Sequence, residues 1–544
     1  MKVADAIAEV LKREGVETLI AYPVNHIIEA AARADIRTVI VRQERIGLHM
    51  ADAMARLSSG KTIGVFAMQH GPGTENAFGG VAQAYSESVP ILVLPMGYPR
   101  DIAHIHPNFN AVENFRYVTK SIEPLTTPDQ VANVMRRAFT QMRSGRPGPA
   151  LIEVPADLVN ADHPGDLKYT PTFSTRSGPD PKAVEVAADA LVSAKRPVIY
   201  AGQGVHYAKA WEPLKRLAER LAAPVTTSIS GKSAFPENHA LSLGTAGRAM
   251  PRPVHDYLHN SDVLFGIGCS FTTTSFGAKM PTDKRVIHAT LDPVDVNKNI
   301  IAEHAMIGDA GLTLEALNEA VDERLGNQVP DATPIAEDIA KGKKAWLNEW
   351  MPKLTSDETP LSPYRVLWDL AHTVDRENAI VTHDAGSPRD QITPFWDAIT
   401  PLSYIGWGKT TQLGYGLGLA MGAKLVQPDK LCMNVWGDAA IGFTGMDFET
   451  AVRERIPILS ILLNNFSMAI ELPIMKVATE KYRSTDISGD YAAMARAFGG
   501  YGERVTEPTE IIPAIKRGIE QTEQGTPALL EFITSKENTV SVFN

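Results

Sequence analysis

The stretch LCMNVWGDAAIGFTGMDFETAVRERIPILSILLNN, from Leu431 to Asn465, decides the fold. Two apolar runs flank a segment with helical character, Met446 to Arg455. The first run ends in Gly437-Asp438, and the second ends in Asn464-Asn465. A parallel strand–helix–strand unit brings both strand ends to one edge of a sheet, where open α/β sheets bind ligands. We therefore expect the aspartate and the last asparagine to face the same crevice.

Oxygen-bearing side chains at such an edge indicate a hard cation. A carboxylate and an amide oxygen suit Mg²⁺, which usually keeps phosphate and water in its remaining positions. The backbone N–H groups of Ala439 and Ala440 are placed to hold a phosphate group, because helix starts attract anions. Taken singly, Gly-Asp and Asn-Asn are also common turn residues. Their occurrence at both ends of one unit favours the ligand-binding interpretation.

Length and composition are those of a multidomain globular protein. The 544 residues predict about three domains, and 44% hydrophobic and 21% charged residues are ordinary values. The formal net charge of −10 argues against nucleic acid and anionic membranes as partners. No apolar stretch approaches the ~18–20 residues that span a bilayer. The charged N-terminus is expected to be a first helix rather than a signal peptide.

The two cysteines, Cys269 and Cys432, both lie in apolar runs that resemble strands. Neither a disulfide framework nor a cysteine metal site is expected from so few cysteines. Inert core thiols in a reducing, cytoplasmic location fit this usage.

Strand and helix signals alternate in three blocks, which predicts an α/β protein with three consecutive domains, each a parallel sheet flanked by helices. We place the N-terminal domain at 1–160, a central nucleotide-binding-like domain at 183–325 and a C-terminal domain at 360–540. Polar segments, 160–182 and one that begins at 326, separate them. The clearest expected elements are strands at Thr18–Ala21, Thr38–Arg42, Thr62–Met68, Ile91–Met96, Ala150–Val154, Pro197–Ala201, Val263–Ile267 and Val286–Thr290, and a helix at Arg45–Ser58.

The pattern Gly437-Asp438 followed by Asn464-Asn465 resembles the thiamine-diphosphate motif of the acetolactate synthase, pyruvate oxidase and 2-oxo acid decarboxylase superfamily. The resemblance covers nearly the whole chain and implies pyrimidine-binding, central and diphosphate-binding domains. It also implies that Asp438, Asn465 and the backbone carbonyl of Ser467 bind Mg²⁺, which anchors the cofactor diphosphate. The cofactor-binding set is then Glu44, Gly386, Ser387, Gln412, Leu413, Gly437, Asp438, Ala439, Ala440, Asn465, Ser467, Met468, Ala469 and Ile470.

Ala439 departs from the commonest form of this motif, which has a glycine at that position. Alanine does not easily adopt a positive φ. A Gly-Asp-Ser/Ala variant with a similar following stretch occurs in the oxalyl-CoA decarboxylase and 2-hydroxyacyl-CoA lyase branch. The departure therefore bears on the subfamily rather than on the cofactor.

Glu44, in VRQERIGLHMADAMAR, lies between an expected strand and an expected helix. The helix dipole alone would also favour an acid in a first turn. By resemblance, this glutamate hydrogen-bonds the aminopyrimidine of the cofactor and relays the proton whose loss creates its nucleophilic carbon. We therefore predict that Glu44 is catalytic.

Two further stretches resemble cofactor-binding segments. In GWGKTTQLGYGLGLAMGAK (Gly406–Lys424), Leu413 occupies the position of the bulky residue that holds the cofactor bent. In HDAGSPRD, Gly386 and Ser387 are the candidates for contact with the diphosphate. Asp384 in the same stretch has two equally good interpretations, a contact with the diphosphate and a helix cap.

Polar side chains of the N-terminal block are candidates for an active-site role. MQHGPGTENAF resembles the family's Ser-Gly-Pro-Gly loop, where Gln69 and His70 would face the cofactor. Histidine transfers protons near neutral pH. His26 replaces a residue that is small in much of the family, and Asn110 replaces a glutamine of acetolactate synthases. For a lone histidine, a structural or exposed position is the ordinary alternative.

Glu471, six residues beyond Asn465, resembles a glutamate of pyruvate and indolepyruvate decarboxylases that acts in decarboxylation. A carboxyl group desolvated beside the reacting carbon has a raised pKa and can act as an acid. A solvent-facing helix acid is the alternative. Acetolactate synthases usually carry an apolar residue here and a tryptophan at the position of Ile474, which disfavours a strict biosynthetic enzyme of that type.

The sequence of the central block indicates whether the protein binds a flavin. Acetolactate synthases and oxidases bind FAD there, with an arginine in a Gly-x-Arg-Phe-Asp-Asp stretch. This chain has Ser270 at the arginine position and Thr272 and Thr273 at the acids, so FAD is disfavoured although not excluded. Arg248 and Asp292 stay candidate nucleotide contacts.

The resemblance implies C–C bond cleavage or formation beside a carbonyl, on a 2-oxo acid or a related substrate. Acetolactate-synthase-like carboligation is the first hypothesis. A 2-oxo acid decarboxylase or an acyl-CoA lyase is the second, and an inactive cofactor-binding paralogue is a minor third. Family active sites lie between subunits, which implies a homodimer or homotetramer with Glu44 and Asp438 meeting across an interface.

Overall fold

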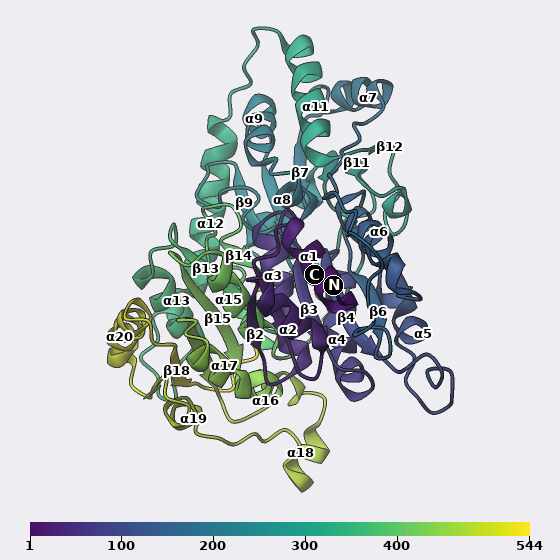
Figure 1. Cartoon of the computed structure of the whole chain (residues 1–544). Helices are drawn as coiled ribbons and strands as arrows, with labels where there is room; N and C mark the ends of the chain where they lie inside the picture. Colours follow the sequence, from purple (N-terminus) through teal and green to yellow (C-terminus); the bar gives the residue numbers. More distant parts are fainter. Residues whose placement is uncertain (411, 544) are drawn as a thin grey trace.

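The computed structural model describes residues 1–410 and 412–543, and Thr411 of the quoted Gly-rich stretch lies outside them. It contains three parallel sheets of six strands each, so the predicted fold class is confirmed. Figure 1 shows an N-terminal part in purple and blue, a central part in teal and a C-terminal part in green and yellow. Helices cover the sheets, as parallel strands require.

The N-terminal sheet has the strand order β2-β1-β3-β4-β6-β5. Its strands are β1 (Thr18–Ala21), β2 (Arg37–Ile40), β3 (Gly64–Met68), β4 (Ile91–Gly97), β5 (Ser121–Pro124) and β6 (Ala150–Pro155). Its helices are α1 (Val3–Arg13), α2 (His26–Arg33), α3 (Glu44–Leu57), α4 (Pro72–Ser86), α5 (Ala111–Phe115) and α6 (Val131–Arg143).

The C-terminal sheet has the order β14-β13-β15-β16-β18-β17. Its strands are β13 (Ala379–His383), β14 (Tyr404–Ile405), β15 (Leu431–Gly437), β16 (Leu459–Asn464), β17 (Tyr501–Val505) and β18 (Ala528–Ile533). Its helices are α13 (Pro363–Thr373), α14 (Ser387–Ile392), α15 (Tyr415–Val426), α16 (Asp438–Thr444), α17 (Phe448–Arg453), α18 (Lys476–Tyr482), α19 (Tyr491–Ala497) and α20 (Ile511–Glu523). When the strands of each domain are numbered from its own first strand, the N-terminal and C-terminal sheets have the same strand order.

The central sheet has the order β12-β11-β10-β7-β8-β9. Its strands are β7 (Pro197–Ala201), β8 (Val225–Ser228), β9 (Ser242–Ala246), β10 (Val263–Ile267), β11 (Arg285–Thr290) and β12 (His304–Ile307). Its helices are α7 (Pro181–Val192), α8 (Gly204–Tyr207), α9 (Trp211–Leu221), α10 (Arg252–Asn260) and α11 (Ala310–Leu325), and α12 (Thr333–Leu354) leads on to the C-terminal part.

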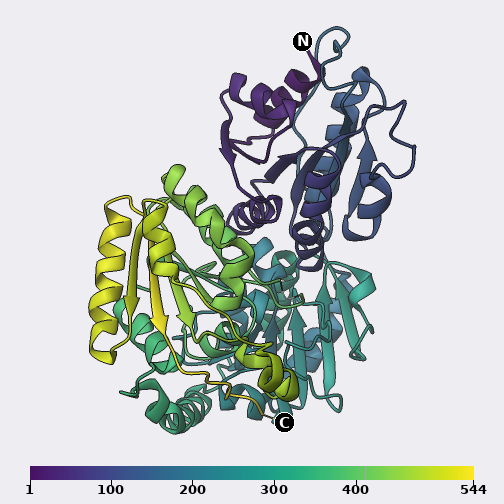
Figure 2. The same cartoon turned by 90° about the horizontal axis from the view of Figure 1, so that it is seen from below.

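Helices α3 and α15 join the N-terminal and C-terminal parts. Glycines make their close approach feasible, because a Cβ on Gly422 would lie 2.3 Å from the carbonyl oxygen of Met50 and one on Gly418 would lie 2.5 Å from Cβ of His49. One continuous hydrophobic core runs through both parts at this contact. The view in Figure 2 shows the N-terminal part beside the other two rather than between them.

Several expected boundaries differ from the structure. The helix expected at Met446–Arg455 is the shorter α17, and a separate helix, α16, already starts at Asp438. Cys432 lies in β15 as expected, but Cys269 lies two residues beyond the end of β10. Both thiols are buried and free. Within the described residues, no helix is both long and apolar enough to cross a bilayer.

Candidate active site

A cavity of about 300 Å³ opens at the carboxyl edge of the C-terminal sheet. It lies where β13, β15 and β16 end, at the point where the strand order reverses, which is the usual ligand position in such sheets. The following candidates predicted from the sequence line this cavity: Gly386, Ser387, Leu413, Gly437, Asp438, Ala439, Ala440, Asn465, Ser467, Met468, Ala469, Ile470 and Glu471. The structure thus brings all of these candidates together.

Asp438 and Asn465 converge on one backbone amide. The N–H of Ser467 donates to Asp438 Oδ2 at 3.0 Å and to Asn465 Oδ1 at 3.0 Å. The N–H of Asn465 also donates to Asp438 Oδ2, at 3.2 Å. Burial raises the pKa of Asp438, and these amide hydrogen bonds oppose the rise. Asp438 Oδ2 and Asn465 Oδ1 are therefore held next to the same backbone N–H group, at the rim of the cavity.

This oxygen set fits Mg²⁺. One carboxylate, one amide oxygen and a nearby backbone carbonyl are hard ligands, and Mg²⁺ completes its octahedron with phosphate and water. Among the described residues, no group of three His, Cys, Asp or Glu side chains could hold a metal by itself. A cation at Asp438 would be held by this carboxylate together with amide, backbone and water oxygens.

Ala439 costs no backbone strain here. It is the second residue of α16, and Asp438 starts that helix, so a right-handed conformation is required rather than a positive φ. The N–H of Ala439 donates to Asp438 Oδ1 at 2.9 Å. The absence of the usual glycine therefore leaves the start of α16 unstrained.

Asp384 positions the turn that carries Leu413. Its carboxylate accepts hydrogen bonds from the N–H groups of Gly414 at 2.9 Å and Gly416 at 2.8 Å. Desolvation raises its pKa to about 6, and these hydrogen bonds limit the rise. Of the two interpretations offered for Asp384, the capping one matches this geometry.

The loop after β16 is held from a distant segment. Asn538 donates from Nδ2 to the carbonyl oxygen of Ala469 at 2.7 Å. Glu471, half-buried, ends the short 3-10 turn Ala469–Glu471 that follows. Sequence reasoning missed Asn538, and no local pattern marks it, because the contact joins residues 69 positions apart.

A second group of candidates gathers at the carboxyl edge of the N-terminal sheet. Glu44 is buried at the first position of α3, and the Asn76 side chain lies beside its carboxylate. Burial raises the pKa of Glu44, and the hydrogen bonds partly offset the rise. A Cβ on Gly73 would meet both Gln69 and Glu44, so these two side chains flank the same glycine. Asn76 was not predicted.

The remaining N-terminal candidates differ in their surroundings. The His70 ring packs edge-on against Tyr98 with ring centroids 4.6 Å apart, and its buried Nδ1 has no partner within the described residues. His26 is exposed, and its Nδ1 lies 3.4 Å from Nδ2 of Asn160. Asn110 caps α5 by accepting a hydrogen bond from the N–H of Glu113. Of the three, His70 has the environment most suited to chemistry.

The N-terminal candidates do not line the C-terminal cavity. Among the described residues, every residue that lines the 300 Å³ cavity belongs to the C-terminal part, and neither Glu44, Gln69, His70, His26 nor Asn110 is one of them. Gln412 also turns away from the cavity, since it bonds to the Gly79 carbonyl oxygen and lies 3.3 Å from His49.

The pKa of Glu44 predicts a pH-dependent stability. Because the folded-state pKa lies above the ordinary value of 4.5, the folded state binds more protons, and stability falls as pH rises from 4.5 through the folded pKa. Glu44→Gln removes this penalty. We expect it to raise the thermal midpoint of the apoprotein by on the order of 1–3 °C at pH 8. The gain should vanish at pH 4, and a gain of equal size at both pH values would contradict it.

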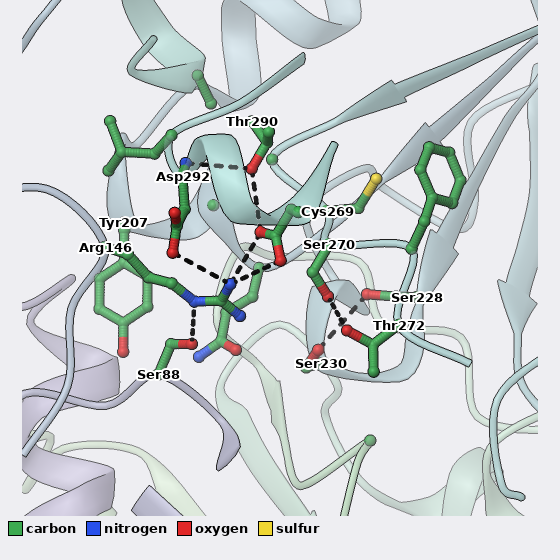
Figure 3. A pocket seen from close by; sticks show the side chains of 18 of the residues that line it. Ser88, Arg146, Tyr207, Ser228, Ser230, Cys269, Ser270, Thr272, Thr290 and Asp292 are labelled. Carbon is green, nitrogen blue, oxygen red and sulfur yellow. Dashed lines mark hydrogen bonds and ion pairs between the residues drawn. The ribbon is translucent and has the colours of Figure 1, made fainter. Parts of the chain in front are cut away.

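A larger cavity, of about 450 Å³, lies where all three parts meet at the carboxyl edge of the central sheet. Figure 3 shows Arg146 at its wall, with contacts to Ser88 and Asp292. Nη1 of Arg146 also donates to both carboxylate oxygens of Asp295, each at 2.8 Å. Ser270 bonds to Thr272 on the facing wall at 2.7 Å.

Comparisons with known proteins agree with this arrangement. Three family models of thiamine pyrophosphate enzymes match the chain in order. The N-terminal TPP binding domain matches residues 1–119, the central domain matches 184–317, and the C-terminal TPP binding domain matches 384–532. The matches cover the whole central sheet and most strands of the two outer sheets, and they define a thiamine-diphosphate-dependent enzyme.

Individual proteins similar to this chain indicate the group of thiamine-diphosphate-dependent enzymes to which it belongs. The acetolactate synthase large subunit of Parasynechococcus marenigrum is 30% identical over 93% of this chain and 83% of its own length. A probable acetolactate synthase large subunit of Methanococcus aeolicus is 29% identical over 100% and 93%, and isozyme 3 of Escherichia coli K12 is 28% identical over 95% and 92%. The chain belongs to the thiamine-diphosphate-dependent acetolactate synthase and pyruvate oxidase superfamily, and it is an acetolactate-synthase-like enzyme of that group.

Proposed function

We propose that this enzyme uses thiamine diphosphate and Mg²⁺ to form or cleave a C–C bond beside the carbonyl of a 2-oxo acid, with acetolactate-synthase-like carboligation as the leading reaction. The observation that carries the proposal is the convergence of Asp438 and Asn465 on the Ser467 amide at the rim of a cavity. Relatives named acetolactate synthase over nearly the full chain support the carboligase assignment.

Each part of the chain has a role in this proposal. Thiamine diphosphate supplies a nucleophilic carbon and an electron sink. Asp438, Asn465 and the Ser467 carbonyl would hold the Mg²⁺ ion that binds the diphosphate. Gly386 and Ser387, at the start of α14, would contact the phosphates, and the Leu413 side chain would support the ring system. Glu44 would move a proton to and from the aminopyrimidine, for which its raised pKa suits it.

We propose a homodimer or a higher homo-oligomer in which each active site is completed by two chains. The separation of Glu44 from the Asp438 cavity within one chain supports this assembly. Exposed apolar side chains on both parts also support it. They include Tyr117, 84% exposed, and Ile474, 79% exposed.

Incubation with pyruvate separates the two leading reactions. We expect the Mg²⁺- and cofactor-loaded protein to release CO₂ and to form acetolactate. Acetaldehyde as the main product would favour the decarboxylase alternative, for which Glu471 at the cavity is the supporting observation. Turnover only with an acyl-CoA would favour the lyase alternative. Absence of cofactor binding would contradict the proposal.

FAD stays disfavoured in this proposal. By resemblance, a flavin would occupy the central cavity, but the arginine and the two acids expected on one wall are Ser270, Thr272 and Thr273. The guanidinium of Arg146 on the other wall is engaged by Asp295. These residues do not fit the flavin site of the family, and no step depends on a flavin.

A further inference from the structure

One loop joins the two cavities. Gly408 and Lys409 line the central cavity, and Leu413 lines the C-terminal one. The loop lies between β14 and α15, so its described residues are 406–410 and 412–414, and Tyr415 is the first residue of α15. Any displacement of this loop would move a wall of the cofactor cavity. What holds the loop is therefore relevant to cofactor binding.

A buried arginine of the N-terminal part holds both ends of this loop. Arg56, on α3, donates from Nη1 to the carbonyl oxygen of Gly406 at 2.6 Å and from Nη2 to Tyr415 Oη at 2.7 Å. Its Nε donates to Asp52 at 2.5 Å, and the Tyr415 hydroxyl donates to the same carboxylate at 2.9 Å. The Arg56 and Asp52 side chains are 4% and 2% exposed. The planar guanidinium fork thus spans the loop ends in a way that a lysine cannot reproduce.

Helix α4 holds the middle of the loop. Glu87, just beyond its C-terminal end, is fully buried and accepts hydrogen bonds from the N–H groups of Gly408 at 3.1 Å and Lys409 at 2.7 Å. Gln83 accepts one from the Thr410 hydroxyl at 2.5 Å. Within the described residues, the N-terminal part of the same chain thus holds the loop at both ends and at its centre.

We propose that Arg56 is a positioning residue for the cofactor site, because together with Asp384 it holds the loop that carries Leu413. This inference rests on the proposed function only where it concerns thiamine diphosphate. Arg56 does not line the cofactor cavity, so its effect must pass through the loop. The N-terminal part then has two separate tasks: Glu44 at the start of α3 serves chemistry, and Arg56 near its end shapes the cavity of its own chain.

The test uses Arg56→Lys, which keeps the buried charge and loses the fork. Lys409 lies inside the loop and offers a tryptic cleavage point that reports loop opening. We expect cleavage after Lys409, located by mass spectrometry, to be at least about tenfold faster in Arg56→Lys than in wild type. The dissociation constant for thiamine diphosphate with Mg²⁺ should rise about tenfold. Tyr415→Phe should shift both quantities less, in the same direction.

The control is Arg365→Lys, which alters a pair of the same kind, Arg365 with Asp369 at 2.8 Å, on α13. It should change neither quantity, and far-UV circular dichroism at the assay temperature confirms that each variant is folded. Wild-type protein that fails to bind the cofactor would reject the proposed function, while the cleavage rates would still decide the role of Arg56. An unchanged cleavage rate in folded Arg56→Lys, or equal acceleration in Arg365→Lys, would overturn the inference.

Discussion

Replacing Glu44 with alanine should abolish proton exchange at C2 of bound thiamine diphosphate while leaving cofactor binding measurable. Glu44 is a buried carboxylate with a raised pKa in the N-terminal part, and the proposed Mg²⁺ ligands lie on the C-terminal part. A positioned acid–base group typically contributes 10²–10⁴-fold to a rate, so turnover should fall by at least about 100-fold. Deuterium exchange followed by NMR of the quenched cofactor measures the effect directly.

Glu212→Ala is the matched control, since Glu212 is an exposed first-turn acid of α9 in the central part. Its exchange rate and turnover should equal those of wild type. Exchange at the wild-type rate in Glu44→Ala would refute the catalytic role of Glu44. Loss of cofactor binding in the same variant would instead assign Glu44 to binding.

Replacing Asp438 with alanine should remove the Mg²⁺-dependent part of cofactor binding. The Asp438 carboxylate accepts hydrogen bonds from the N–H groups of Asn465 and Ser467, and the Asn465 amide oxygen accepts from the same Ser467 N–H. Its loss takes away both a proposed metal ligand and the acceptor that holds two backbone N–H groups after β16. We expect the dissociation constant of thiamine diphosphate at saturating Mg²⁺ to rise at least about 100-fold, as measured by titration calorimetry.

Asp429→Ala tests whether this effect is local. Asp429 is exposed and lies just before β15, at the opposite end of the strand that leads to Asp438. Its removal should leave the dissociation constant unchanged. If Asp438→Ala still bound the cofactor with wild-type affinity in the presence of Mg²⁺, the assignment of the metal site would be wrong.

Local sequence patterns were sufficient to predict that Asp438 and Asn465 lie close together. Asp438 and Asn465 each follow an apolar strand in a single strand–helix–strand unit, and parallel pairing of β15 with β16 brings the strand ends together. Strands such as β1, β7 and β10 have the expected bounds for the same reason: each is a short apolar run between polar turns. Short edge elements such as β14 have too few residues to show a pattern.

Contacts between distant segments could not be predicted from such patterns. Asn538 meets Ala469, Asn76 meets Glu44, and Arg56 meets Gly406 only because the chain folds back on itself. The two outer domains also share one strand order, although the sequence shows no obvious repeat. Sheet topology depends on hydrophobic faces and helix connections, which many sequences satisfy.

The separation of Glu44 from the Asp438 cavity gives the central claim its most direct test, which is complementation between two inactive variants. When Glu44→Ala and Asp438→Ala chains are co-expressed with different tags, a hybrid dimer contains one site with both native residues and one site with neither. Random pairing should restore about a quarter of wild-type turnover. Purified hybrid dimers that stay as inactive as either parent would contradict an active site shared between the N-terminal domain of one chain and the C-terminal domain of its partner.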